Sequence, residues 1–138
     1  MTGDRTWRVR VTATAENDIR NILQWTYERF GDVQAQIYGE TLTRAIQALT
    51  EGPYVTGSRQ RDDIGEGLLT LHVARGRRKG RHLVLYRIGD KGTSRMIEVL
   101  RLLHDSMDLV RHVPAKEPDR DAIHDNDVRI TLRLARNL

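Results

Sequence analysis

The chain has 138 residues, of which 38% are hydrophobic and 30% are charged, and this length is typical of a single domain. It contains no cysteine, which excludes disulfide bonds, a thiolate nucleophile and any cysteine-ligated zinc or iron–sulfur centre. The net charge is +4, no apolar run approaches the ~20 residues of a transmembrane helix, and no apolar leader is seen, so we expect a soluble, cytoplasmic protein.

The first third of the chain predicts a strand followed by two helices. Residues 7–11 alternate apolar and basic side chains, which is the pattern of a half-buried strand. Thr12 supplies a helix N-cap oxygen, and apolar residues at helical spacing then continue to Phe30. Gly31 interrupts this pattern before a second helical pattern over residues 33–49. Two helices joined at a glycine predict an antiparallel helical hairpin.

The middle of the chain predicts a loop and three strands. Residues 54–67 are rich in glycine and charge, which favours a loop. Strand patterns follow at residues 69–74, 83–88 and 97–101, and the second is apolar on both faces, as a central strand is. A short helix is expected at residues 105–112. The order β-α-α-β-β-β predicts an α+β domain in which the helical hairpin packs on an antiparallel sheet.

The C-terminal part differs in composition from the rest of the chain. We expect the domain to cover residues 1–114 and a C-terminal extension of unknown role to cover residues 115–138. The extension starts with an acidic, linker-like stretch, and the alternation at residues 128–134 is compatible with an edge strand.

Positive charge is concentrated between Leu71 and His104, where nine cations face only two anions. Most of these cations are arginines, which favour bidentate contacts to carboxylate or phosphate over proton transfer. The predicted hairpin loop at residues 75–81 contains five of them. Two interpretations stay open for this loop: a surface that binds anions, and a solvated hairpin without a ligand.

Several side chains are candidates for a site. His82, Tyr86, Arg101 and His104 are placed to converge on one sheet surface, where Lys79 adds a cation for cleaving RNA, although strand-end histidines more often have structural roles. Trp25, Tyr27 and Tyr38 on the hairpin favour either an exposed face that receives a partner helix or ordinary core packing. The Asp62-Asp63 pair beside Arg59 and Arg61 indicates local ion pairs. The five histidines are scattered, so no metal site is predicted.

Four blocks of the sequence together carry a family resemblance. They are Thr12–Ile19 with Ile22, Trp25, Phe30–Gly31 and Ala35; Arg61–Ile64 with Gly67–Leu68; Gly80–Arg87; and Ile97–His104 with Met107–Leu109. The last block is the most specific, because an apolar strand that ends in an arginine and a histidine is followed by an Asp-Leu helix start. In these blocks the sequence resembles the ParE-type toxins of the RelE/ParE superfamily, and the resemblance covers residues 7–113.

This resemblance implies the toxin of a type II toxin–antitoxin pair that needs no cofactor, binds DNA gyrase and stabilises its cleaved-DNA complex, and is neutralised by a ParD-like antitoxin. On this interpretation the toxin is not an enzyme, because gyrase itself cleaves the DNA. We expect the gyrase contacts at Arg77, Arg78, Arg81, Arg101, His104 and Asp108. We expect the antitoxin contacts at Trp25, Tyr38, Arg75 and Arg87.

Two alternatives share the same fold. One is a RelE-like, ribosome-dependent mRNA endoribonuclease that uses Lys79, His82, Arg101 and His104. The other is an inactive family member that only pairs with its antitoxin. The scarcity of lysine and the absence of any aromatic residue after Tyr86 disfavour the nuclease, and the long C-terminal extension, which departs from the family pattern, keeps the inactive member open.

Overall fold

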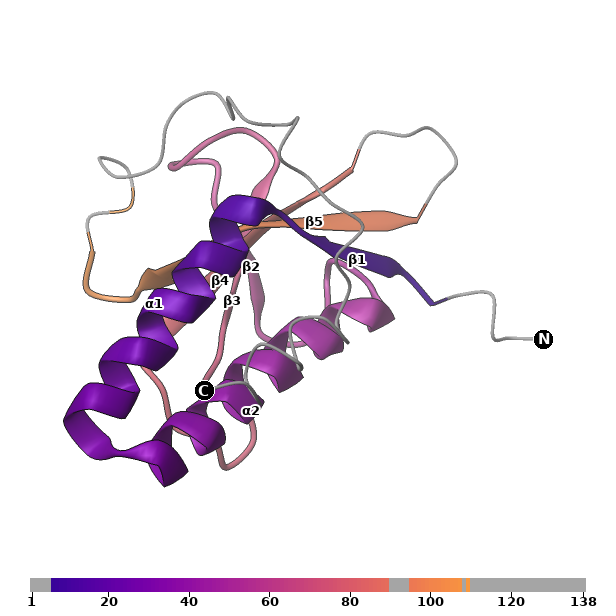
Figure 1. Ribbon diagram of the computed structural model, residues 1–138. Helices are drawn as coiled ribbons and strands as arrows, with labels where there is room; N and C mark the ends of the chain where they lie inside the picture. Colours follow the sequence, from indigo (N-terminus) through magenta and orange to yellow (C-terminus); the bar gives the residue numbers. More distant parts are fainter. Residues whose placement is uncertain (1–5, 90–94, 108, 110–138) are drawn as a thin grey trace.

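The computed structural model describes residues 6–89, 95–107 and 109, which form two helices and a five-stranded sheet (Figure 1). The predicted element order is confirmed, with one short strand added inside the segment expected to be a loop. The elements in chain order are β1 (Arg8–Val11), α1 (Ala13–Phe30), α2 (Asp32–Ala48), the 3-10 helix η2 (Leu49–Glu51), β2 (Ser58–Gln60), β3 (Leu68–His72), β4 (His82–Ile88) and β5 (Met96–His104).

The helical hairpin begins and turns at the residues that the sequence predicts. The Thr12 side chain caps α1 by accepting a hydrogen bond from the Ala15 amide (3.2 Å), and its hydroxyl also donates to the Val99 carbonyl (3.0 Å). Thr12 therefore joins the start of α1 to the central part of β5. Gly31 separates the helices with φ of 93°, a conformation that L side chains rarely adopt.

The sheet corrects one part of the predicted fold, because it is mixed rather than antiparallel. Its strand order is β1-β5-β4-β3-β2, and β1 runs parallel to β5, with Arg8 opposite Met96 and Val11 opposite Val99. The other three pairings are antiparallel, as predicted. The alternation of residues 7–11 identifies a strand but carries no information on its partner or direction, which depend on how the hairpin packs.

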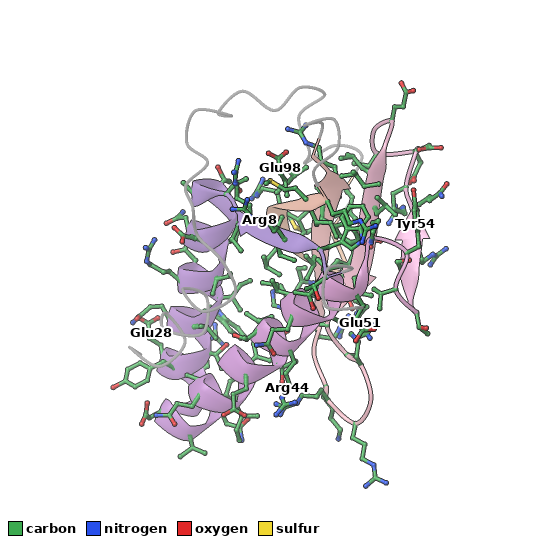
Figure 2. The ribbon with its side chains drawn as sticks, turned by 90° about the vertical axis from the view of Figure 1, so that its right-hand side faces the viewer. Arg8, Glu28, Arg44, Glu51, Tyr54 and Glu98 are labelled. Carbon is green, nitrogen blue, oxygen red and sulfur yellow. The ribbon has the colours of Figure 1, made fainter. Side chains whose placement is uncertain are left out.

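Both helices cover one face of the sheet, and their apolar stripes fill the layer between them (Figure 2). Ile19 and Leu23 of α1 and Ile46 of α2 are almost completely buried there against β4 and β5. Tyr86 is also buried in this layer; its hydroxyl donates to the Pro53 carbonyl (2.6 Å), and burial raises its pKa to about 12. A second apolar cluster contains Leu85, Leu100, Leu103 and Leu109.

Several predictions fall on residues outside those described. The expected helix at residues 105–112 is described only in part, and the extension at residues 115–138, with its predicted strand at 128–134, is not described. Within the described part of the chain, no helix combines the length and apolar character that crossing a bilayer requires.

Candidate functional site

A cleft of about 930 Å³ lies between the helical hairpin and the loop that joins β3 to β4. Its lining comes from α1, α2, this loop and the ends of β4 and β5. The lining residues are Asn21, Ile22, Trp25, Thr26, Phe30, Gln34, Ile37, Tyr38, Thr41, Arg77, Arg78, Lys79, Gly80, Arg81, His82 and His104.

The helices give the cleft an apolar wall, formed by Trp25, Phe30 and Ile37. These side chains are 52%, 62% and 46% exposed, although residues of this kind are normally buried. Trp25 and Phe30 pack edge to face with their ring centroids 5.9 Å apart. A contiguous apolar surface beside charged residues is typical of a site that binds a protein partner.

The opposite side of the cleft is a cationic rim, formed by Arg77, Arg78, Lys79 and Arg81. Arg78 lies 3.6 Å from Glu40, whereas Arg81 forms a 3.1 Å ion pair with Asp105. Arg77 and Lys79 form no ion pair with any residue that the structure describes. The rim therefore keeps positive charge that is available to an anionic ligand.

The rim is held against the helices through Gly80 and Tyr38. A side chain at position 80 would bring its Cβ within 2.6 Å of Val73 and 2.9 Å of the Tyr38 ring, so only glycine lets the loop approach this closely. The Tyr38 oxygen accepts a hydrogen bond from the Arg81 amide (3.1 Å). These contacts fix the loop relative to α2, and burial raises the pKa of Tyr38.

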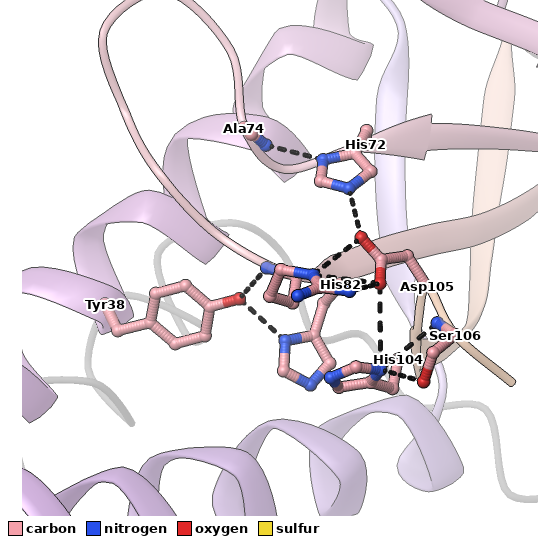
Figure 3. A network of polar contacts seen from close by, with 8 residues as sticks. Tyr38, His72, Ala74, His82, His104, Asp105 and Ser106 are labelled. Atoms are coloured by element: carbon pink, nitrogen blue, oxygen red, sulfur yellow. Dashed lines mark hydrogen bonds and ion pairs between the residues drawn. The ribbon is translucent and has the colours of Figure 1, made fainter.

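Two histidines close one end of the cleft (Figure 3). His82 and His104 are paired in register on β4 and β5, and their ring centroids are 5.3 Å apart. The Tyr38 hydroxyl accepts from the Arg81 amide and also forms a 2.6 Å hydrogen bond with His82 Nδ1. This contact fixes the orientation of the His82 ring against α2.

The position of a ring proton does follow for His104. Its Nδ1 accepts from the Ser106 amide (3.1 Å) and lies 2.7 Å from the Ser106 hydroxyl, so Nε2 carries a proton. Burial, and secondarily the neighbouring His104, lowers the pKa of His82 to about 4, so His82 is neutral near pH 7. His104 thus leaves its Nε2–H as a donor for a ligand, which suits an anionic oxygen better than it suits proton abstraction.

Asp105 holds two side chains next to the cleft, His72 and Arg81, in place. Its carboxylate accepts from His72 Nε2 (2.9 Å) and from Arg81 Nε (3.1 and 3.2 Å) (Figure 3). The Arg81 guanidinium and the His72 ring together lower the pKa of Asp105 to about 2. Asp105 therefore orients Arg81 and stays ionised at any pH near neutrality.

The structure brings most of the expected gyrase-binding residues into this cleft. Arg77, Arg78, Arg81 and His104 line it. Arg101 does not line it, because Asp18 of α1 binds its guanidinium at 2.8 and 3.2 Å. Asp108 lies outside the described residues.

The residues expected to bind the antitoxin divide into two groups. Trp25 and Tyr38 line the cleft. Arg75 instead donates to the Thr56 carbonyl (2.6 Å), and Arg87 pairs with Glu98 (2.9 Å). The two expected surfaces are therefore not separate, since members of both meet in one cleft.

The quartet expected to converge on the sheet does so only in part. His82 and His104 meet, and Lys79 lines the same cleft, but Tyr86 is buried in the core and Arg101 is held by Asp18. The expected local ion pair is present between Arg61 and Asp63 (2.8 Å). Among the described residues, no group of three histidine or carboxylate side chains is placed to hold a metal ion.

Sequence reasoning missed two parts of the site. Phe30 continues the apolar pattern of its helix and is therefore expected to be buried, yet it is the last residue of α1, at the tip of the hairpin, and is 62% exposed. A signal was available, since the glycine that follows Phe30 marks this tip. The role of Asp105 has no comparable signal, because its partners His72 and Arg81 lie 33 and 24 residues away.

Comparisons with known proteins agree on one family. A family model described as the ParE toxin of the type II toxin–antitoxin system parDE matches residues 9–109, which include every residue that lines the cleft. Toxin ParE1 of Mycobacterium tuberculosis (strain H37Rv) is 31% identical over 106 residues, which cover 77% of this chain and 97% of the relative. Toxin ParE1 of Caulobacter vibrioides is 29% identical over 107 residues, covering 75% of this chain and 95% of the relative.

Proposed function

Because this chain belongs to the ParE toxin family of type II toxin–antitoxin systems, we propose that it inhibits DNA gyrase by binding the enzyme and stabilising its cleaved-DNA complex. The proposal rests on the resemblance to ParE-type toxins, whose known action is the inhibition of gyrase. The proposed partner that neutralises the toxin is a ParD-like antitoxin.

The observation that carries this proposal is the meeting of an exposed apolar wall and a cationic rim in one cleft. Such a surface fits an amphipathic segment that buries its apolar side chains on Trp25, Phe30 and Ile37. Carboxylates on the other side of that segment would face the rim and the Nε2–H donor of His104. We assign this chemistry to the neutralising segment of the antitoxin.

The shared residues give a simple mechanism of neutralisation. Arg77, Arg78 and Arg81 are the proposed gyrase contacts, and they also line the cleft that we assign to the antitoxin. A segment bound in the cleft covers these guanidinium groups. Binding of the antitoxin and binding of gyrase then exclude each other without any change of shape.

The ribosome-dependent endoribonuclease is the second candidate, because Lys79, His82 and His104 meet in the cleft. Two observations favour binding over cleavage. Arg101, the fourth residue of the proposed catalytic set, is held by Asp18. One nitrogen of each histidine is already engaged inside the fold, since His82 Nδ1 is bonded to the Tyr38 hydroxyl and His104 Nδ1 accepts from the Ser106 amide.

The test is incubation of the purified chain with gyrase, ATP and supercoiled plasmid, followed by denaturation and a search for linear DNA. Linear DNA that requires both proteins supports the proposal. The triple variant R77A/R78A/R81A is expected to produce far less linear DNA, whereas R20A/R44A, which removes two exposed arginines outside the cleft lining, is expected to behave as the parent.

A folded chain that yields no linear DNA contradicts gyrase inhibition. The parallel arm adds the chain to translating ribosomes and maps mRNA ends. Cleavage in that arm alone selects the endoribonuclease, and inactivity in both arms together with tight antitoxin binding selects the inactive family member.

A further inference from the structure

The described chain ends in the second apolar cluster, on the sheet face away from the helices. The last strand, β5, ends at His104, whose ring lines the cleft, and the last described residue, Leu109, packs on Leu85, Leu100 and Leu103. The sequence continues to residue 138. The match to the ParE toxin family ends at residue 109, so this continuation is a property of this chain and not of the family domain.

The continuation contains acidic and apolar side chains, which complement the cationic rim and the apolar wall of the cleft. Residues 117–127 contain five carboxylates (Glu117, Asp119, Asp121, Asp125 and Asp127) and only one cation, Arg120. Residues 128–134 follow with an apolar residue at every second position (Val128, Ile130, Leu132 and Leu134) and with Arg129, Thr131 and Arg133 between them. An acidic stretch is thus followed directly by a stretch with one apolar face, called the apolar stretch below.

We propose that residues 117–134 of the same chain occupy the cleft, with the acidic stretch on the cationic rim and the apolar stretch on the apolar wall. The rim and the apolar wall line the same cleft, so one segment can contact both. Arg77 and Lys79, which form no ion pair among the described residues, gain carboxylate partners.

The length of the chain allows this contact. Twelve residues separate His104 from Glu117, and an extended chain covers up to ~3.5 Å per residue, so the acidic stretch can return to the cleft from either face of the sheet. Because the segment is tethered, its effective concentration at the cleft is of the order of millimolar even if its intrinsic affinity is weak.

The consequence rests on the proposed function of the cleft. A segment that occupies the cleft for nine-tenths of the time weakens any competing ligand by about tenfold, because the competitor binds only the open fraction. The extension is therefore an intrachain competitor of the antitoxin segment, and it also covers the rim arginines that we assign to gyrase.

The absence of cysteine allows a direct test on the full chain. Spin labels are attached at Gln36→Cys, exposed on α2 and outside the cleft lining, and at Thr131→Cys in the extension, and the distance between them is measured by pulsed electron spin resonance. We expect one narrow, short distance distribution. It is lost in the variant E117Q/D119N/D121N/D125N/D127N and in R77A/K79A, and it is retained in R20A/R44A.

A broad distribution without a short component overturns the proposal, as does a short distance that the charge variants leave unchanged. A short distance that disappears on dilution with unlabelled chain also overturns it, because the contact is then between two copies. This measurement involves neither gyrase nor antitoxin. In the gyrase assay, the amide variant of the extension is expected to reach the parent's yield of linear DNA at about one-tenth of the concentration.

Discussion

Two groups of arginines in this molecule look alike in the sequence and differ in the structure. Arg101 joins β5 to α1 through Asp18, whose side chain is only 13% exposed and also accepts a hydrogen bond from the Leu102 amide (3.0 Å). By contrast, Arg77 on the cationic rim has no carboxylate partner among the described residues. Arginine composition indicates that anions are bound, and only the position of each partner shows whether the anion belongs to the fold or to a ligand.

Removing the internal partner is expected to have the largest effect. Asp18→Ala removes the carboxylate that accepts from the partly buried Arg101 guanidinium and from the Leu102 amide, so the free energy of unfolding should fall by about 3 kcal/mol. Urea denaturation measures this. The matched control Asp32→Ala, which removes an exposed carboxylate bonded only to Gln36, should change stability by less than ~0.5 kcal/mol. Equal effects of the two variants would show that the contacts of Asp18 stabilise the fold no more than those of an exposed carboxylate.

His82 is expected to give the next largest effect, which appears in the pH dependence of the free energy of unfolding. The pKa of His82 is lowered from 6.5 to about 4, so between these values the unfolded chain binds a proton that the folded chain does not. Stability should therefore be complete above pH 6.5 and decrease as the pH falls towards 4, by on the order of 1–2 kcal/mol for a partly exposed group. Urea denaturation of the parent and His82→Asn across this range tests it, and parallel pH curves would refute it.

Asp105 should give a smaller effect at more acidic pH. Its folded pKa of about 2 lies below the ordinary value of 3.8, so its contribution is present above pH ~4 and is lost as the pH falls through about 2. Asp105→Asn should lack this acid-dependent component, which is visible as a shallower loss of stability between pH 4 and pH 2. A variant that loses stability as steeply as the parent would show that the ion pair with Arg81 is not the cause.

The cationic rim should have the smallest effect on folding. Because Arg77 and Lys79 lack ion-pair partners among the described residues, R77A/K79A should change the free energy of unfolding by less than ~0.5 kcal/mol while weakening the binding of acidic ligands. Urea denaturation and titration with the purified antitoxin measure the two quantities. A clear loss of stability would show that Arg77 and Lys79 stabilise the fold, as Arg101 does.

Much of the fold could be predicted, because its elements are encoded by local signals. The cap at Thr12, the break at Gly31 and the two-sided apolar strand at residues 83–88 are each visible in the sequence. The predicted membership of the ParE toxin family is also confirmed. The parallel direction of β1 could not be predicted, since it depends on contacts between residues almost ninety positions apart.

The site was less predictable, because it depends on which side chains the fold leaves uncovered. The sequence leaves a partner-binding face and core packing open for Trp25, Tyr27 and Tyr38, and in the structure Trp25 and Tyr38 line the cleft whereas Tyr27 does not. The expected hairpin connection of the basic loop is confirmed. Arg87 and Arg101 have the same composition signal as the rim arginines, yet Glu98 and Asp18 bind them inside the fold. No local pattern distinguishes these cases, because both carboxylates are distant in the sequence or on another strand.

The parallel pairing of β1 with β5 has a consequence for how the protein is made. Arg8 meets Met96, so the first strand emerges from the ribosome dozens of residues before its partner, a delay of several seconds at ~5–20 residues per second. The cleft is also incomplete until His104 has been synthesised. A nascent toxin therefore has no finished binding surface during most of its translation, and both its activity and its recognition by a partner begin only as synthesis of the domain ends.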